Sequence, residues 1–395
     1  MKDYFMDLHI HVGRSENGKA VKITASPKLT VANILSEALN KKGLQVIGIV
    51  DCASPGVLTD LKTMLAAGTL QEMAGGGFSY LDNLALIPGV ELETQEGNGQ
   101  AHFLAYFPTM ARLEEFARFV AGRVKNPQLS TQACHLKARD LLRVVLDHAG
   151  LFVPAHIFTP HRSIFGACAT SLEEMFPGKA QEITAVELGL SADSQIAGYL
   201  PELRHRVFLS NSDAHSLEKI GREYNLIQIA DPSFTELKFL LENKKGRRVI
   251  ANYGLDPRLG KYHRSYCNRC NEARLAEGPV LSCPECGEKR DFVTGVWDRI
   301  YSISPGGEVP APAIPYKYQV PLAFLPGMGK KTQSKLLERL GTEMNVIHQA
   351  STEELSEIVG KSLARMIVKA RQGELTLRPG AGGIYGKVDN TEYLD

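Results

Sequence analysis

The sequence predicts an α/β fold, with a parallel sheet or barrel that is followed by two smaller modules. From residue 1 to about 255, short apolar runs alternate with longer helical patterns, which is typical of strands that alternate with helices. Clustered cysteines fill 256–303, and 304–395 opens with a Pro/Gly-rich linker before small helices. Roughly eight strands in about 250 residues suit a β/α barrel.

Eight apolar runs are the candidate strands of the first region. In chain order they are YFMDLHI, QVIGIVD, LALIPGVE, AHFLAYF, LFVPAHI, ITAVELG, RVFLSNSD and YNLIQIA. The helical stretches between them include VANILSEALNKKG, MARLEEFARFVAG and ARDLLRVVLDHAG, and the last of these ends in a glycine, a common helix stop. The final residues, RPGAGGIYGKVDNTEYLD, are predicted to form a loose tail.

Composition and charge narrow the class of protein. The chain has 395 residues, 44% of them hydrophobic, and a net charge of +1, so no global field indicates a polyanionic partner. No apolar run approaches the ~18 residues of a membrane span, so we expect a cytoplasmic protein without a membrane partner. Seven cysteines, four of them clustered, favour metal binding over disulfides.

Nearly every candidate strand ends in a histidine or a carboxylate. Side chains two apart on a strand point the same way, so His9 and His11 stand side by side. Carboxyl ends of barrel strands line one rim, and there we expect an N/O ligand set for two or three divalent metals (Zn²⁺, Mn²⁺ or Mg²⁺). One such histidine alone is more often structural, but the recurrence predicts a site. The predicted ligands are His9, His11, Asp51, Glu91, His102, His156, Asp213 and His215.

These motifs resemble a known superfamily. DLHIH, GIVD, GVE, AHF, PAH and SNSDAH resemble, in this order, the motifs of the polymerase-and-histidinol-phosphatase (PHP) superfamily of metal-dependent phosphoesterases. The resemblance covers the first two thirds of the chain and implies a distorted seven-stranded β/α barrel of PHP type. Cys52 stands where many members have a histidine, and Gly13, Arg14 and Ser15 where many carry another. The third metal site is therefore open, and Cys52 is either a soft ligand or a small buried residue.

The second motif is YCNRCNEARLAEGPVLSCPECGE, with two C-x₂-C pairs. Four thiolates at this spacing can close a tetrahedral zinc site, whose binding energy folds a module too small for a core. A redox pair is the alternative reading. A closed site predicts structural Zn²⁺, held by Cys267, Cys270, Cys283 and Cys286. The surrounding arginines and lysines suit either phosphate contact or an ordinary solvated face.

The third motif is LPGMGKKTQSKLLERLG, residues 325–341. Two glycines permit a tight turn before a helix, whose free backbone N–H groups can bind a phosphate. The motif resembles half of a helix-hairpin-helix element, which binds DNA backbones, although many such turns are plain helix caps. The predicted DNA-binding residues are Gly327, Gly329, Lys330, Lys331 and Thr332.

A phosphoesterase barrel followed by these two elements is similar to the endonuclease Q family of DNA repair enzymes. The segments that carry this similarity are VELGLSAD, PAHIFTPHRSIFGA, SNSDAHS and LPGMGKK. His161 stands where an aromatic residue is expected. The resemblance implies an endonuclease that nicks DNA 5′ of a deaminated base (uracil, hypoxanthine, xanthine) or an abasic site, leaving 3′-hydroxyl and 5′-phosphate ends. Damaged DNA is the implied partner, and a sliding clamp at the tail is a second partner to test.

We expect Asp213 and Asp51 to be the catalytic carboxylates, which bridge metals or orient water. Selecting a damaged base implies that it is flipped from the duplex, and loops 22–28, 157–166 and 187–193 are the predicted pocket. Two alternatives stay open at this point. They are a small-molecule phosphatase of the histidinol-phosphate type and a non-catalytic nucleic-acid-binding scaffold.

Overall fold

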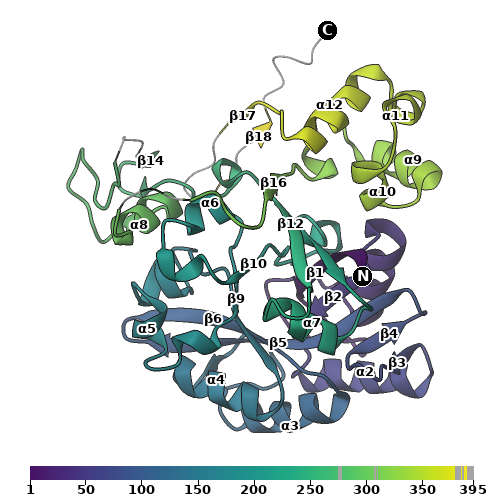
Figure 1. The fold of residues 1–395 in the computed structure, drawn as a ribbon, viewed down its shortest axis with the longest axis horizontal. Helices are drawn as coiled ribbons and strands as arrows, with labels where there is room; N and C mark the ends of the chain where they lie inside the picture. Colours follow the sequence, from purple (N-terminus) through teal and green to yellow (C-terminus); the bar gives the residue numbers. More distant parts are fainter. Residues whose placement is uncertain (275–277, 307, 309, 379–383, 385–386, 389–395) are drawn as a thin grey trace.

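The computed structural model describes residues 1–395 except 275–277, 307, 309, 379–383, 385–386 and 389–395. A barrel-like body fills the lower part of Figure 1, with the four-cysteine module above it on one side and the C-terminal helices on the other. The predicted fold class, an α/β barrel followed by two small modules, is confirmed. Among the described residues, no helix combines the length and the apolar character that a membrane crossing needs.

Seven strands form the ring of the barrel. They are β1 Lys2–Ile10, β2 Val46–Ile49, β5 Leu84–Glu96, β6 Gly99–Tyr106, β8 Leu151–Pro154, β9 Ala185–Glu187 and β10 Val207–Leu209. The pairs β1–β2, β2–β5 and β9–β10 are parallel. The ring closes beyond β10, where Ala214 exchanges backbone hydrogen bonds of 3.1 Å with His9 and His11.

The ring departs from the all-parallel pairing that alternating strands and helices suggest. Strand β6 pairs antiparallel with both β5 and β8. Only residues 97 and 98 separate β5 from β6, and so short a connection permits a hairpin but not the crossover that parallel strands need. This distortion brings the ends of β5 and β6 to the same part of the rim.

Further strands extend the ring, and of these only β11 was predicted. Strand β11 pairs antiparallel with β1, and β12 with β11, while β16 returns from the linker region to pair parallel with β12. The others lie against β5 or its neighbour β4. Their bounds are β3 Leu70–Glu72, β4 Phe78–Tyr80, β7 Ala133–Cys134, β11 Tyr224–Ile229, β12 Arg248–Gly254 and β16 Tyr316–Tyr318.

Helices cover the outside of the ring, and the three predicted helical stretches are present. Helix α3 shows why they form: Thr109 caps its first turn, and Leu113, Phe116 and Val120 bury one face. The bounds are α1 Val31–Glu37, α2 Pro55–Ala66, α3 Met110–Ala121, α4 Ala138–Asp147, α5 Leu172–Met175, α6 Ser194–Ala197 and α7 Phe234–Leu241. Single-turn or π-type elements are η1 Ala38–Lys42, η2 Ile164–Cys168, η3 Ala180–Glu182, η4 Pro201–Leu203, η5 Leu217–Lys219, η6 Pro257–Leu259 and η7 Leu322–Phe324.

The C-terminal third forms two appendages. The cysteine module contains β13 Tyr266–Cys267, β14 Glu272–Ala273, β15 Phe292–Val293 and α8 Val296–Ile303. Helices α9 Lys330–Leu340, α10 Glu343–His348, α11 Thr352–Val359 and α12 Lys361–Gln372 share a separate apolar core. Part of the predicted loose tail is ordered as β17 Leu377–Arg378 against β18 Lys387–Val388, and most of the rest lies outside the described residues.

Candidate metal centre and pocket

Six of the eight predicted barrel ligands gather into two groups at one end of the ring. His9, His11 and Asp213 form the first group, and their ligand atoms lie within 4.8 Å of one another. Glu91, His102 and His156 meet the same limit and form the second group. His9 Nε2 lies 3.5 Å from Glu91 Oε1, so the two groups adjoin. This arrangement suits a pair of neighbouring divalent ions.

The nitrogen atoms of these groups fit a cation. Nε2 of His9, Nε2 of His11 and Nδ1 of His156 are buried and make no hydrogen bond within the described part of the chain. A buried polar atom without a partner is costly, and a metal ion is a natural partner for an imidazole lone pair. The mixed nitrogen and oxygen donors suit ions such as Zn²⁺ or Mn²⁺.

Two carboxylates hold the β1 histidines from behind. Both oxygens of Asp51 lie 3.1 Å from His11 Nδ1, and those of Glu187 lie 3.0 and 3.1 Å from His9 Nδ1. A carboxylate on one ring nitrogen fixes the other nitrogen for a metal. Asp51 was predicted to be a metal ligand. In the structure it lies behind the predicted ligand His11 and contacts that ring. Glu187, which ends β9 and begins the predicted pocket loop 187–193, was not predicted as a partner of His9.

The charges of the centre reinforce one another. Burial opposes the charged form of His9, but Glu187 and Asp213 outweigh it and raise the pKa of His9 well above its usual value. Burial likewise opposes the ionised form of Asp213, yet His9 and His11 hold its pKa well below the usual range. The centre therefore keeps its carboxylates ionised, the state in which they bind cations.

The second group also has support that the sequence did not reveal. His102 Nδ1 lies 2.9 Å from Glu91 Oε1, and its Nε2 lies 3.1 Å from Glu93 Oε2. Glu93 follows Glu91 by two residues on β5 and so points the same way. This spacing is the same signal that identified His9 and His11, and it could have found Glu93.

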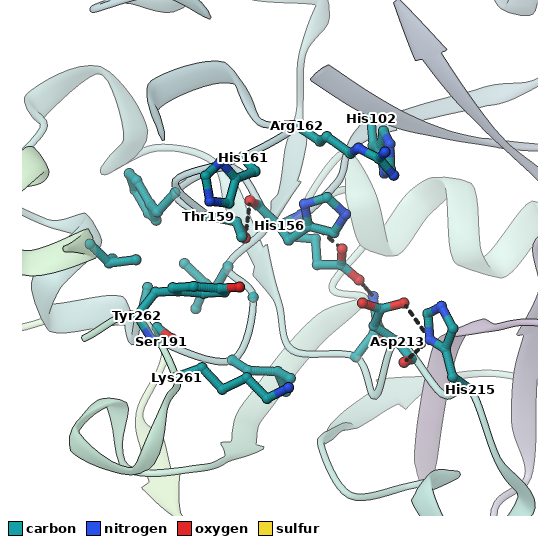
Figure 2. Close-up of a pocket in the computed structure, with 18 of the residues that line it drawn as sticks. His102, His156, Thr159, His161, Arg162, Ser191, Asp213, His215, Lys261 and Tyr262 are labelled. Carbon is teal, nitrogen blue, oxygen red and sulfur yellow. Dashed lines mark hydrogen bonds and ion pairs between the residues drawn. The ribbon is translucent and has the colours of Figure 1, made fainter. Parts of the chain in front are cut away.

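Two residues of the centre have backbone angles that non-glycine residues rarely adopt. φ is +45° at Asp213 and +30° at His156. Such conformations cost energy and cluster at functional sites. The Asp213 side chain is 32% exposed and faces the pocket (Figure 2). Next to it, His215 donates from Nδ1 to the Asp213 carbonyl at 3.0 Å, and burial together with His11 lowers the pKa of His215 to about 4.

The centre forms the floor of a pocket of about 470 Å³, a volume within the usual range for small-ligand sites. All three predicted loops line it, through residues 22 and 24, residues 158, 159, 161 and 162, and residues 187–192. One wall comes from the start of the cysteine module, where Lys261 and Tyr262 face the barrel loops (Figure 2). The rings of His161 and Tyr262 meet edge to face at 5.9 Å between centroids.

Cys52 is a small buried residue in this structure. Its Sγ donates to the Ile49 carbonyl at 3.2 Å, and burial raises the pKa of the thiol to about 12. A thiol that stays protonated is a poor metal ligand. In the described residues of the barrel, no third group of three ligands accompanies the two above.

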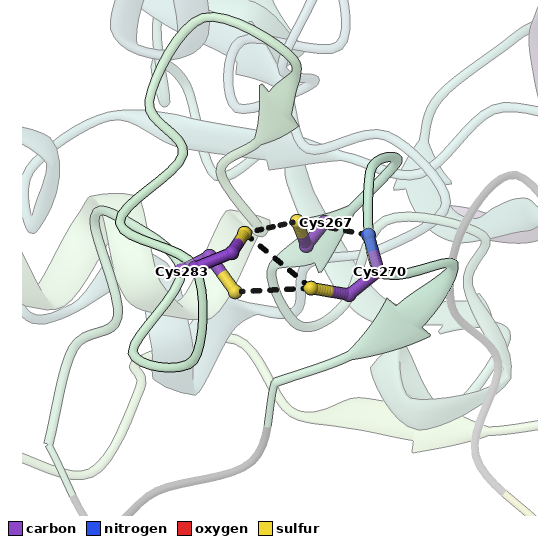
Figure 3. Close-up of side chains that lie close together, drawn as sticks. Cys267, Cys270 and Cys283 are labelled. Atoms are coloured by element: carbon purple, nitrogen blue, oxygen red, sulfur yellow. Dashed lines mark hydrogen bonds between the residues drawn. The ribbon is translucent and has the colours of Figure 1, made fainter.

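The four cysteines of the module converge as their spacing predicts (Figure 3). Sγ of Cys270 lies 3.7 Å from that of Cys283 and 3.4 Å from that of Cys286, and Cys267 and Cys286 are 3.7 Å apart. Tetrahedral Zn–S bonds of about 2.3 Å place sulfur atoms roughly 3.8 Å apart. The four thiols therefore fit a zinc ion without rearrangement of the chain.

The glycine turn of the third motif leads directly into helix α9. Gly327 has φ +81°, Gly329 caps the helix, and Lys330, Lys331 and Thr332 form its first turn. A second turn, missed in the sequence, joins α11 to α12 at Gly360, which has φ +82°. The signal was present as VGKS, a second Gly-Lys pair before a helical stretch.

Comparison with known proteins places this architecture in a family. No family model matches the chain. It is 44% identical over 391 residues to the uncharacterized protein YqxK of Bacillus subtilis (strain 168), with 98% of this chain and 100% of that protein covered.

Two solved structures resemble nearly the whole chain. One is the lesion-specific endonuclease PfuEndoQ from Pyrococcus furiosus, with a TM-score of 0.83, 30% identity, and 98% of this chain and 95% of that chain covered. The other is endonuclease Q in complex with a 27-mer duplex substrate that has an abasic lesion at the active site. Its TM-score is 0.84 at 29% identity, with 100% of this chain and 98% of that chain covered. Since both likenesses span the barrel, the cysteine module and the C-terminal helices together, the chain belongs to the endonuclease Q family.

Proposed function

We propose that the protein is a lesion-specific DNA endonuclease, a metal-dependent phosphodiesterase. It nicks one strand on the 5′ side of a deaminated base (uracil, hypoxanthine or xanthine) or an abasic site. The observation that carries this proposal is the placement of two adjoining ligand groups on the floor of a pocket whose walls come from both the barrel and the cysteine module. The related enzymes that act on lesions support it.

The reaction is hydrolysis of a phosphodiester. Water adds to phosphorus, the P–O3′ bond breaks, and the departing 3′-oxygen takes up a proton, which leaves 3′-hydroxyl and 5′-phosphate ends. Divalent cations in the two groups would activate water and neutralise phosphate charge. Zn²⁺, Mn²⁺ and Mg²⁺ are the ions to compare, and Zn²⁺ is the ion that we assign to the four cysteines.

The two predicted catalytic carboxylates have different tasks in this proposal. Asp213 is partly exposed to the pocket, 3.2 Å from His11 Nε2, where it can hold a cation and orient water. Asp51 is buried behind His11 and acts as a positioning residue through that ring. His215 flanks Asp213 at the pocket edge and completes the set of predicted ligands.

The pocket walls suit a base that has left the duplex. Tyr262 and His161 offer ring surfaces, and Ser191 and Thr159 offer hydroxyl groups beside them (Figure 2). Flipping costs least where a base is mispaired or absent. Selection of a lesion would thus combine the low cost of extrusion with hydrogen bonds in the pocket.

The C-terminal turn comes near a residue that adjoins the pocket. Glu218 is adjacent to the pocket residue Lys219, and its pKa is lowered first by a backbone hydrogen bond and further by the charges of Lys330 and Lys28. Lys330 begins α9, so the predicted DNA-binding turn is close to the pocket rim. We propose that a duplex contacts the turn and the pocket together, and a sliding clamp stays a further partner to test.

The test uses end-labelled duplexes with one uracil, hypoxanthine, xanthine or abasic site, beside an undamaged duplex. The purified protein is incubated with each of them in Mg²⁺, Mn²⁺ or Zn²⁺, and an Asp213→Asn variant is run in parallel. We expect a single nick immediately 5′ of the lesion that is lost in the variant. Hydrolysis of a phosphate monoester without any nick would favour a phosphatase instead, and DNA binding without hydrolysis would favour a scaffold.

A further inference from the structure

One ammonium group lies inside the metal centre. Lys22, in the loop between β1 and α1, has a side chain that is only 13% exposed and that lines the pocket. Its Nζ lies 3.0 Å from Glu91 Oε2 and donates to Thr131 Oγ1 at 2.5 Å. The lysine therefore places its ammonium nitrogen directly against a carboxylate of the second ligand group.

Thr131 closes a three-residue cluster around one oxygen of Glu91. Its hydroxyl donates to Glu91 Oε2 at 2.7 Å while it accepts from Lys22. Thr131 has φ +49°, a conformation that is a genuine outlier for a β-branched residue and costs energy. The neighbouring Ser130 donates its backbone N–H to Val21 at 3.0 Å, which ties the loop of Thr131 to the loop of Lys22.

The cluster separates the two oxygens of Glu91. Oε2 accepts hydrogen bonds from Lys22 and Thr131. Oε1 lies 2.9 Å from His102 Nδ1 and 3.5 Å from His156 Nε2. Oε1 is thus the oxygen directed into the second ligand group. An ammonium has three N–H donors, and in the described residues Glu91 and Thr131 use two of them, which leaves one for an anion in the pocket.

We propose that Lys22 is a positioning residue of the metal centre, which together with Thr131 holds Glu91 so that Oε1 faces the ion. Its remaining N–H donor faces the pocket as a fixed positive charge and contacts the scissile phosphate. Lys22 supplies the centre with one cation that no chelator removes. This inference rests on the proposed function only for the identity of the phosphate.

The test separates positioning from a merely structural role. Lys22→Met removes the donor that holds Glu91, so we expect Mn²⁺ to bind about 3- to 10-fold more weakly. Nicking under single-turnover conditions at saturating Mn²⁺ should still fall about 100-fold, because the phosphate loses its partner. Free Mn²⁺ is followed by electron paramagnetic resonance, since thiolate sites do not favour this ion. A structural defect would instead lower both quantities equally in Lys22→Met and Lys22→Arg.

Matched variants sharpen the result. Thr131→Val keeps the shape but removes the hydroxyl, and about a 5- to 10-fold slower nicking is expected. Lys22→Arg keeps the charge and should retain more activity than Lys22→Met, and Lys19→Met, which removes an exposed charge from the same loop, should change neither measurement. Mn²⁺ affinity that is unchanged or tighter in Lys22→Met, or nicking at the wild-type rate, would overturn the proposal. If the wild-type protein nicks no duplex, the proposed function fails, but the Mn²⁺ titration still decides the role of Lys22.

Discussion

The barrel centre and the four-cysteine site are built in opposite ways. The barrel centre takes its ligands from several strands and the loops that follow them, between His9 and Asp213, so it exists only once the ring has closed. The other site takes four thiols from a short stretch between Cys267 and Cys286, beside strands of two residues each. A segment this small cannot bury enough apolar surface to fold alone. The barrel thus forms the site for its ions, whereas the module depends on its ion to fold.

The two regions meet through several contacts. Arg299 on α8 donates from Nε to the Phe165 carbonyl of the barrel at 2.8 Å, Ser304 donates to the Tyr199 carbonyl at 3.1 Å, and Tyr262 contacts His161 across the pocket. The module therefore contributes to the pocket wall, whereas both ligand groups of the barrel come from barrel residues. If the two sites form independently, a substitution that disrupts one of them should leave the metal of the other in place.

The largest effect is expected at the barrel centre. Asp213→Asn keeps the shape of the side chain but removes its charge, and nicking should fall by at least about 10³-fold, because a ligand of both ion and water is lost. Single-turnover cleavage of an abasic duplex measures this. Asp231→Asn, at an exposed position, is the control, and loss of zinc from the cysteine module in Asp213→Asn would contradict the independence of the two sites.

A large effect on binding is expected at the module. Cys283→Ser should release one zinc ion per chain and weaken binding of the lesion duplex about 100-fold, because the wall that carries Tyr262 loses its support. Zinc content and fluorescence anisotropy of a labelled duplex report the two changes. Cys168→Ser, outside the cluster, should retain both its zinc and its duplex binding. Full duplex binding by zinc-free Cys283→Ser would show that the pocket does not need the zinc-bound module.

An intermediate effect is expected behind the ligands. Glu187→Gln replaces the carboxylate on His9 Nδ1 by a neutral amide, and Mn²⁺ affinity should fall about 10- to 100-fold. Excess Mn²⁺ should restore most of the nicking rate, since the ligands themselves are intact. Glu182→Gln, at an exposed position, is the control. Unchanged Mn²⁺ affinity in Glu187→Gln would show that Glu187 does not orient His9.

The smallest effect concerns stability and pH. Glu223 is buried, accepts from Leu255 N at 2.8 Å with one oxygen, and has no partner for Oε2 among the described residues. Burial raises its pKa to about 8, so the folded protein keeps a proton that the unfolded chain releases above its ordinary pKa. The resulting stability is complete below about pH 4.5 and is lost towards pH 8, by at most ~1.4 kcal/mol per pH unit.

Glu223→Gln keeps a neutral side chain at every pH and should remove this slope. Urea unfolding at pH 5, 6.5 and 8 measures the free energy of unfolding. The variant should gain stability over the wild-type protein as pH rises, and equal slopes for both proteins would show that Glu223 is ionised in the folded state.

The difference between the two regions also explains what the sequence could reveal. The cysteine site was predictable from spacing alone, because its ligands are neighbours in the chain. The barrel ligands His9, Glu91 and Asp213 were recognisable because each lies at the end of a strand predicted from the sequence, and strand ends share a rim. The division of these ligands into two groups of three could not be predicted from the sequence, because it depends on how the ring closes.

The partners of the ligands were harder to recognise. Lys22 and Thr131 lie in loops, where no periodicity marks a side chain that points inward, and Lys261 reaches the pocket only through docking of the module. The antiparallel pairing of β6 was missed although its cause is local, because β6 follows β5 without a helix between them. Long-range packing decides the placement of Lys22, Thr131 and Lys261, and a local pattern does not contain it.

Elemental analysis of the purified protein tests the central claim most directly, namely that the chemistry rests on barrel ions distinct from the module's zinc. The account predicts three divalent ions per chain, two in the barrel groups and one at the four cysteines. A His9→Ala, His102→Ala double variant should keep only the zinc of the module, and Cys283→Ser should keep only the barrel ions. Loss of all ions from either variant, or a wild-type protein that binds zinc at the cysteines and no ion in the barrel, would contradict it.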